Sequence, residues 1–498
     1  MPLPIGGNVR WPPAGWERVF RAYAEWSAWY SGDPEALADF YGQAEPLLDR
    51  TPWWKFWARQ RLGKERQPRS QMHVPLAGDI AATSASLLFS EAPDVIVPLA
   101  HGESPDAGAK AAEQRALDIF DQSNAHATLL EAAEAAAALG GVYLRVVWDK
   151  EQFPYPFLSP VHADAALPEF RWGQLWAVTF WRVVEVTGGR VLRHLERYEP
   201  GLILHGLYRG SGERLGEAVE LAAHPSTEGL QDQVALPDNA LAVRYIPNIR
   251  PNRRFRNVAW SALGASDFAG SESLLDALDE CWTSWMRDVR VGKARLLVPE
   301  EWLEKKDGKL QFDVDQEVFV GLAMEPGQEN TGITENQFAI RFEEHSRTAM
   351  ELMERIIVGA GYSPQSFGLR IEGRAESGTA LRIRERKTFM TQQKKRRYWE
   401  QPLADLMRLL LVVDAHFLDG KAKPFPVRVD MADSIQPDPR EIGESIELLN
   451  RAQAASVEVK VRMAHPDWGE EEVQAEAERL RAELGMMLPD LGGPREAT

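Results

Sequence analysis

A basic stretch that begins at Arg382 contains the residues best suited to binding a charged ligand. The segment RIRERKTFMTQQKKRR carries eight cations in a chain that is otherwise acidic. Lysine and arginine neutralise nucleic-acid phosphates, so the stretch could form a positive band facing DNA. The alternative is a solvated helix face, or a face paired with the acidic residues of a neighbouring subunit. The candidates for phosphate contact are Arg382, Arg384, Arg386, Lys387, Lys394, Lys395, Arg396 and Arg397.

The sequence lacks the motifs of the common catalytic sites. It has no G-x-x-x-x-G-K-[ST] phosphate loop, no G-x-S-x-G nucleophile turn and no H-E-x-x-H zinc motif. The ten histidines show no metal-ligand spacing, and a single cysteine, Cys281, excludes a zinc site built from several thiolates. A glycosidase-like carboxylate pair is not excluded, because Asp and Glu are abundant. We predict no catalytic residue, no metal and no cofactor.

Seventeen tryptophans are many for 498 residues, and Trp53, Trp54 and Trp57 lie close together in the sequence. Aromatic clusters of this kind bind sugars or stack on bases. More often they form the core or a subunit interface. The sequence alone leaves these alternatives open.

The charge balance is strongly acidic, with a formal net charge of -17. Such a chain is unsuited to tight, static DNA binding, because binding requires cations at the phosphates. Like charge would instead keep DNA off the walls of a pore through which it slides, although solubility alone also explains an acidic surface. The single cysteine suits a reducing cytoplasm, and we expect neither a signal peptide nor a membrane span.

The first half of the chain predicts an α+β region. The first 65 residues look helical and aromatic, and the apolar spacing predicts helices over 74–91 and 109–139. Buried or alternating runs from Gly141, Leu175 and Gly189 predict strands, the last two in an antiparallel sheet.

The second half is dominated by long helices. We predict helices over 266–292 and 342–361, separated by short strands between 294 and 340. A polar connection, 362–378, leads into one very long helix over 379–418 that contains Pro402, where we expect a bend. A strand from Pro424, a helix opening at Asp438-Pro439 and a last helix that ends near Leu484 complete the chain.

This order of elements resembles the portal proteins of tailed bacteriophages, particularly long-tailed phages of Gram-positive hosts. Several segments look like that family: LGASDFAGSESLLDALDECWTSWMRD from Leu263, ESGTALRIRERKTFMTQQKKRRYWEQPLADLM from Glu376 and AASVEVKVRMAHPDWGEEEVQAEAERLRAE from Ala454. HVPLAGDIAATSASLLFSEAP from His73 and GGVYLRVVWD from Gly140 also match. The specificity lies in the order and joint presence of these segments, which span most of residues 70 to 485.

The resemblance implies a portal fold made of named parts. They are an α/β wing (1–265, joined by the long kinked helix and a strand in 379–437), a stem (helices 266–292 and 342–361), a small β-rich clip (293–341), a tunnel loop (362–378) and a helical crown (438–498). Portal subunits form a homo-oligomeric ring of twelve at one vertex of the virion capsid, assembled in the host cytoplasm. Double-stranded DNA passes through the ring. The clip docks the terminase large subunit and later the head–tail adaptor protein. The major capsid and scaffold proteins are further partners of the ring. No membrane is involved.

Each implied part has its candidate residues. The tunnel loop would present Gln365, Ser366, Arg370, Glu372, Arg374 and Glu376 to DNA. The clip would contact partner proteins through Lys305, Lys306, Asp307 and Lys309. The stem would pack through Leu275, Leu278, Trp282, Trp285, Val289, Met353 and Ile356. The competing hypotheses are a tryptophan-rich carbohydrate-active enzyme, which would be a monomer with paired carboxylates in a cleft, and another minor phage head protein.

Overall fold

The computed structural model describes residues 3–4, 7–41, 71–96, 107–256, 259–291, 295–297, 304–306, 309–311, 334–336, 340–369, 378–418, 420–431, 439–465 and 468–483. The chain divides into two compact units, Met1–Ala432 and Asp433–Thr498. The first unit contains both helices and sheets, in agreement with the predicted α+β class. Within the described residues, no helix is both long and apolar enough to cross a membrane.

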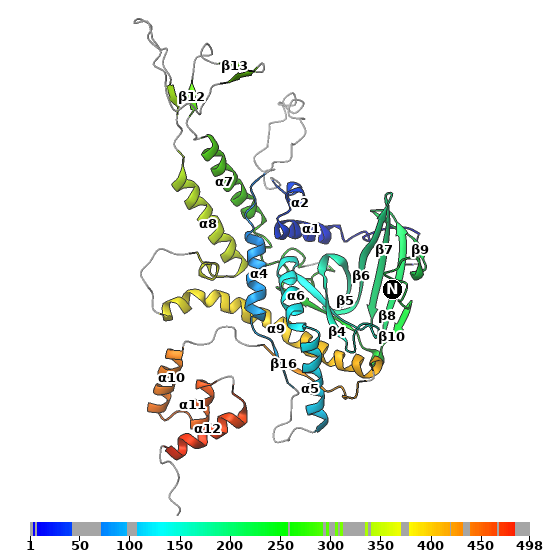
Figure 1. The fold of residues 1–498 in the computed structure, drawn as a ribbon, viewed down its shortest axis with the longest axis vertical. Helices are drawn as coiled ribbons and strands as arrows, with labels where there is room; N and C mark the ends of the chain where they lie inside the picture. Colours follow the sequence, from blue (N-terminus) through cyan, green and yellow to red (C-terminus); the bar gives the residue numbers. More distant parts are fainter. Residues whose placement is uncertain are drawn as a thin grey trace, which may run out of the picture. The chain divides into compact units, whose positions relative to one another are not determined.

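The larger sheet of the first unit has seven strands, in the order β1-β9-β8-β7-β6-β5 with β10 beside β8 (Figure 1). Its longest antiparallel pair is β6 (Gln174–Thr187) and β7 (Arg190–Glu199), which confirms the strands predicted from Leu175 and Gly189. Gly188 and Gly189 join them with φ angles of 58° and 78°, as a two-residue type I′ turn requires. The other strands are β1 (Gly7–Arg10), β5 (Ala166–Arg171), β8 (Leu202–Gly210), β9 (Arg214–Val219) and β10 (Gln233–Ala235).

A smaller sheet, in the order β11-β3-β4, packs against helix α6 (Ala125–Leu139). Its central strand, β3 (Gly141–Val147), is an almost unbroken apolar run because both of its faces are buried. Helix α4 (Leu76–Phe89) lies along α6, where a row of alanines allows close approach. Further elements are α1 (Glu17–Ser31), α2 (Pro34–Ala38), β2 (Asp94–Ile96), β4 (Phe157–His162), β11 (Val243–Pro247) and the 3-10 helices η3 (Ala163–Ala165), η4 (Leu221–Ala223) and η5 (Pro237–Asn239).

The single helix predicted over 109–139 is wrong, because the structure has two helices there. Helix α5 (Ala107–Gln122) ends before Asn124, and α6 begins after it. Asn124 has a φ of 50°, in the left-handed region that asparagine tolerates better than most residues. One residue outside helical geometry is enough to interrupt the hydrogen-bond ladder and redirect the chain.

Helices α7 (Glu272–Val291) and α8 (Phe342–Ala360) lie side by side and run in opposite directions (Figure 1). The prediction that the first of them starts at Ser266 is wrong: Gly270 has a φ of 91°, and the helix starts two residues later. Helix α8 ends at Gly361 with a φ of 99°, as predicted. Between the two helices, β12 (Arg295–Leu297) pairs with β15 (Thr334–Asn336), and β13 (Glu304–Lys306) pairs with β14 (Lys309–Gln311).

Helix α9 (Gly378–Phe417) is the predicted long helix, and it continues through Pro402. The bend expected at this proline stays a prediction. The second half of α9 buries Trp399, Leu403 and Leu406 in the core formed with α4, α5, α6 and β3. The chain then forms β16 (Arg428–Asp430), which pairs with β2.

The second unit contains α10 (Pro439–Arg451), α11 (Val457–Ala464) and α12 (Glu470–Glu483). Its core is small and consists of Val461, Val473 and Ala477. The Ser456 hydroxyl caps α11 by accepting a hydrogen bond from the Val459 amide at 3.3 Å.

Candidate functional site

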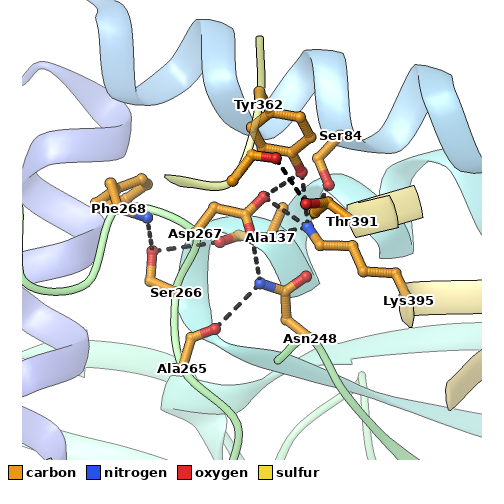
Figure 2. A network of polar contacts seen from close by, with 11 residues as sticks. Ser84, Ala137, Asn248, Ala265, Ser266, Asp267, Phe268, Tyr362, Thr391 and Lys395 are labelled. Carbon is orange, nitrogen blue, oxygen red and sulfur yellow. Dashed lines mark hydrogen bonds and ion pairs between the residues drawn. The ribbon is translucent and has the colours of Figure 1, made fainter. Parts of the chain in front are cut away.

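Lys395 and Asp267 form a buried ion pair inside the first unit (Figure 2). The Lys395 Nζ atom lies 2.7 Å from Oδ1 and 2.6 Å from Oδ2 of Asp267. The two side chains are 2% and 0% exposed. Either charge alone would be very costly at this depth, so each residue requires the other.

Three further side chains complete this polar centre. The Tyr362 hydroxyl donates to Asp267 Oδ2 at 2.8 Å, and Asn248 Nδ2 donates to Oδ1 at 2.7 Å. Lys395 also donates to the Ser84 hydroxyl at 2.6 Å and lies 2.9 Å from the Tyr362 oxygen. The centre therefore ties together α4, the segment before α7, the residue after the α8 cap, and α9.

Burial and charge act in opposite directions on this centre. Burial lowers the pKa of Lys395, and the Asp267 carboxylate opposes that shift. Burial, and then the same carboxylate, raise the pKa of Tyr362 well above its usual value, so that its hydroxyl remains a hydrogen-bond donor. The arrangement suits a fixed structural junction, with every charge paired and every donor used.

The prediction that Lys395 faces phosphates is therefore wrong. Arg396 is half-buried and donates to the Met431 carbonyl. Lys387 is exposed and donates to the Val358 carbonyl at the end of α8. Of the remaining candidates, Arg386, Lys394 and Arg397 are exposed, whereas the side chains of Arg382 and Arg384 lie outside the described part of the chain.

A signal for the burial of Lys395 was present in the sequence. The buried face of α9 continues backward from Trp399 through Lys395, Gln392 and Thr388, at steps of four, three and four residues. This is the helical spacing that Leu403 and Leu406 continue forward. Membership of a charge run favours phosphate contact or a solvated face for Lys395, but its position on the seam is the better guide to its burial.

The predicted tunnel loop falls partly outside the described residues. Its start is ordered: Tyr362 and Ser363 are buried, and η7 (Pro364–Phe367) follows them. Gln365 and Ser366 are half-buried, and the Ser366 hydroxyl lies 3.0 Å from the Thr388 hydroxyl of α9. The other four loop candidates, Arg370, Glu372, Arg374 and Glu376, lie outside the described residues.

The predicted stem residues differ in burial along the α7–α8 pair. Leu275 and Leu278, near the start of α7, are fully buried, and so is Ile356 near the end of α8. Met353, Trp282, Trp285 and Val289 are only half-buried. The pair is thus covered by the rest of the unit at one end and loses that cover toward the end of α7.

An aromatic group occupies the less buried end of the pair. The rings of Trp282 and Trp285 are 5.0 Å apart, and Trp285 contacts Phe342, which is 59% exposed, at 5.4 Å. Asp288 holds Arg341 and His345 at 2.9 and 3.0 Å. Hydrogen bonds from His345 and from Arg341 lower the pKa of Asp288. Polar contacts therefore fix the helix ends, while large apolar side chains stay partly in solvent.

Three of the four predicted clip residues lie on paired strands. Lys305 lies opposite Leu310, and Lys306 lies opposite Lys309, in the β13–β14 pair. Asp307, predicted in the same turn, lies outside the described residues. The structure therefore places the three lysines within the two strands.

A stacked histidine pair in the seven-stranded sheet was missed by sequence reasoning. His194 on β7 and His205 on β8 have ring planes 8° apart, with Nε2 of His194 3.2 Å from Nδ1 of His205. Burial lowers the pKa of His194 to about 4 and also lowers the pKa of His205. No local sequence pattern marks the pair, because the two residues meet only through strand pairing.

Comparison with known proteins adds little to this picture. No family model matches the chain. No curated protein matches it either. Among solved structures, the chain is similar to one described as "Neck of empty GTA particle computed with C6 symmetry", at 14% identity and a TM-score of 0.37, covering 82% of this chain and 88% of that one. A likeness of this strength carries no argument about the function of this chain.

Proposed function

We propose that this chain is the portal subunit of a tailed bacteriophage. Its ring would occupy one capsid vertex and form the channel for packaging and ejecting double-stranded DNA. The clip would dock the terminase motor and then the head–tail adaptor. The proposal rests on the segments that resemble the family and on the order of the elements: an α+β region, two antiparallel helices around a β insertion, and a long helix.

The uneven burial of the α7–α8 pair is the observation that carries the proposal. Leu275 and Leu278 are fully covered by the subunit itself, but Trp282, Trp285 and Phe342 are covered only in part. Partly exposed aromatic residues on a helix pair are typical of an interface. In a ring, each pair would lie between two neighbours and bury this group through a heterologous contact.

The acidic surface supports a channel better than a DNA-binding protein of the usual kind. With a net charge of -17, the ring would repel the duplex over most of its surface. DNA held only by weak, local contacts could move through such a ring without a large barrier.

The mass of the purified full-length protein tests the proposal. We expect a ring of twelve chains of 55.9 kDa each, measured by light scattering coupled to size-exclusion chromatography. A stable monomer at micromolar concentration would contradict the portal assignment and favour the enzyme alternative. A smaller closed oligomer would favour another phage head protein.

A further inference from the structure

A cavity of about 490 Å³ lies where α7 begins and α8 ends. Its wall combines the segment 249–254, the turn before α7, the last residues of α8 and one residue of α9. Four cations line it: Arg250, Arg253, Arg254 and Lys394.

Three of these cations have no carboxylate partner in the described part of the chain. Arg250 donates only to the Ala262 carbonyl, and its buried Nε atom has no hydrogen-bond partner there. Arg253 and Lys394 are exposed and make no hydrogen bond or ion pair with the described residues. Unpaired arginines crowded on one wall repel each other unless an anion joins them.

The acidic residues of the cavity are already engaged. Glu25 pairs with Arg254 at 3.0 Å. Glu272 accepts hydrogen bonds from the Trp26 indole at 3.0 Å and from the Gly270 amide at 2.7 Å. Asp267 is neutralised by Lys395 in the polar centre. A surplus of positive charge therefore remains in the cavity, in a chain that is acidic overall.

We propose that this cavity is a phosphate-binding site, and that its ligand is the backbone of the DNA in the channel. This inference rests on the proposed function, which brings DNA close to the end of α8. Arginine forks match the oxygens of a phosphate and bind it through paired, charge-assisted hydrogen bonds. A phosphodiester and a carboxylate of a neighbouring protein each offer two charged oxygens to these cations, so duplex binding and ring mass must distinguish the two anions.

The test compares two full-length variants of equal net charge. The double substitution Arg253→Gln/Lys394→Gln removes the two free cations of the cavity. The control, Lys110→Gln/Arg209→Gln, removes two exposed cations elsewhere that likewise have no partner among the described residues. Binding of a short fluorescent duplex is measured by anisotropy at several salt concentrations.

We expect the cavity variant to bind the duplex roughly tenfold more weakly or worse at about 0.1 M salt, and its salt slope to fall by about 2 relative to the wild type. The control should change neither quantity by a comparable amount. Equal effects of the two variants would show a general charge effect and overturn the proposal, as would a wild-type protein that binds neither duplex nor phosphate.

Inorganic phosphate distinguishes the source of the anion. At constant ionic strength, phosphate should raise the Tm of the wild type and of the control above the value in chloride, but not that of the cavity variant. If the cavity variant loses the rise in Tm caused by phosphate but binds the duplex as tightly as the wild type, a free phosphate occupies the site and the DNA assignment is wrong.

Ring mass, measured on the same samples, separates this inference from the proposed function. A ring whose cavity variant behaves like the control overturns only the phosphate site. If the wild type is a monomer and the cavity variant still loses the rise in Tm caused by phosphate, the phosphate site stands and the portal proposal is wrong. Loss of the ring in the cavity variant, with phosphate protection unchanged, would assign the cations to carboxylates of a neighbouring copy and overturn the phosphate site.

Discussion

At the scale of single residues, the Lys395–Asp267 pair favours one arrangement of the chain over alternatives in which either charge would be buried without a partner. Desolvation of two charges offsets much of their attraction, so the pair adds little net stability over apolar residues of the same size. Its geometry is nonetheless demanding, because Tyr362, Asn248 and Ser84 must each be in place to satisfy it. We interpret the centre as a determinant of which segments meet.

Lys395→Met should destabilise the subunit by about 3–5 kcal/mol, because Asp267 would be left charged and unpaired in the interior. Urea denaturation measures the change. Lys394→Met is the matched control: this neighbour on the same helix is exposed, and its loss should cost less than about 0.5 kcal/mol. Equal stability of the two variants would mean that water reaches the centre and solvates Asp267. Lys395→Met/Asp267→Asn should recover part of the loss.

The histidine pair predicts a loss of stability in mild acid. Burial lowers the pKa of His194 to about 4 in the folded protein; Glu196 opposes this shift, whereas His205, Arg182 and Arg145 add to it. The unfolded chain binds a proton at this residue near pH 6.5. The contribution is therefore complete above about pH 6.5 and is lost as the pH falls toward 4, by about 3 kcal/mol at most.

His194→Gln should make the fall in unfolding free energy between pH 7 and pH 4.5 shallower than in the wild type, as measured by urea denaturation at each pH. His162→Gln, at an exposed histidine, should leave the fall unchanged. Parallel curves for all three proteins would show that His194 gains its proton without a penalty in the folded state.

At the scale of elements, sequence patterns predicted the helices and strands whose formation depends on nearby residues. Helix α8, the strands β6 and β7 and the long helix α9 follow from spacing and from glycine at their ends. The break at Asn124 was missed because its alanine-rich surroundings all favour a helix. The polar centre was missed because Lys395 and Asp267 are 128 positions apart, and their pairing depends on tertiary contact. Three of the four cavity cations lie in one segment, 250–254, but tertiary contact is needed to bring Lys394 of α9 beside them.

The half-buried tryptophans of α7 should matter more to the assembly than to the subunit. Trp285→Ala removes contacts to Trp282, Phe342 and His345. Because the Trp285 indole is already partly in solvent, the loss of folding free energy within one chain should be below the roughly 3–5 kcal/mol of a fully buried tryptophan. Light scattering on dilution should show the ring dissociating at a higher concentration, about tenfold for each 1.4 kcal/mol lost at an interface.

Trp172→Ala is the control for that experiment, because Trp172 is fully exposed at the turn between β5 and β6. It should leave both the ring mass and the subunit stability unchanged. If Trp285→Ala dissociates no more readily than this control, the aromatic end of the helix pair is not a subunit contact.

At the scale of the whole molecule, the negative charge is unevenly distributed. Residues 433–498 contain 15 acidic and 7 basic residues, so that this short unit carries -8 of the total of -17. The larger unit is closer to neutral for its size and holds the cavity with surplus positive charge. Repulsion from one part and weak local attraction in another would favour passage of DNA over its retention at any fixed place.

Deletion of residues 371–375 should leave the ring intact and impair packaging or retention of DNA in infected cells. These residues follow Gly368, which ends η7, and precede α9, so the deletion spares the packing of Tyr362 and the contact of Ser366 with Thr388. Ring mass and the DNA content of particles are the two measurements. Normal DNA content in particles built from the shortened chain would show that this loop does not contact DNA in the channel.

The polar centre also limits how early each chain can complete its fold during synthesis. Ser84 and Lys395 are 311 positions apart, and Asp267 and Tyr362 lie between them. At a synthesis rate of about 5–20 residues per second, the ribosome needs roughly 15–60 s to supply Lys395 after Ser84. Until Lys395 has been made, Asp267 lacks the cation that pairs with it, and the polar centre cannot join α7, α8 and α9. If copies of the chain join through this helix pair, as proposed, that contact cannot be completed until nearly four-fifths of each chain has been made.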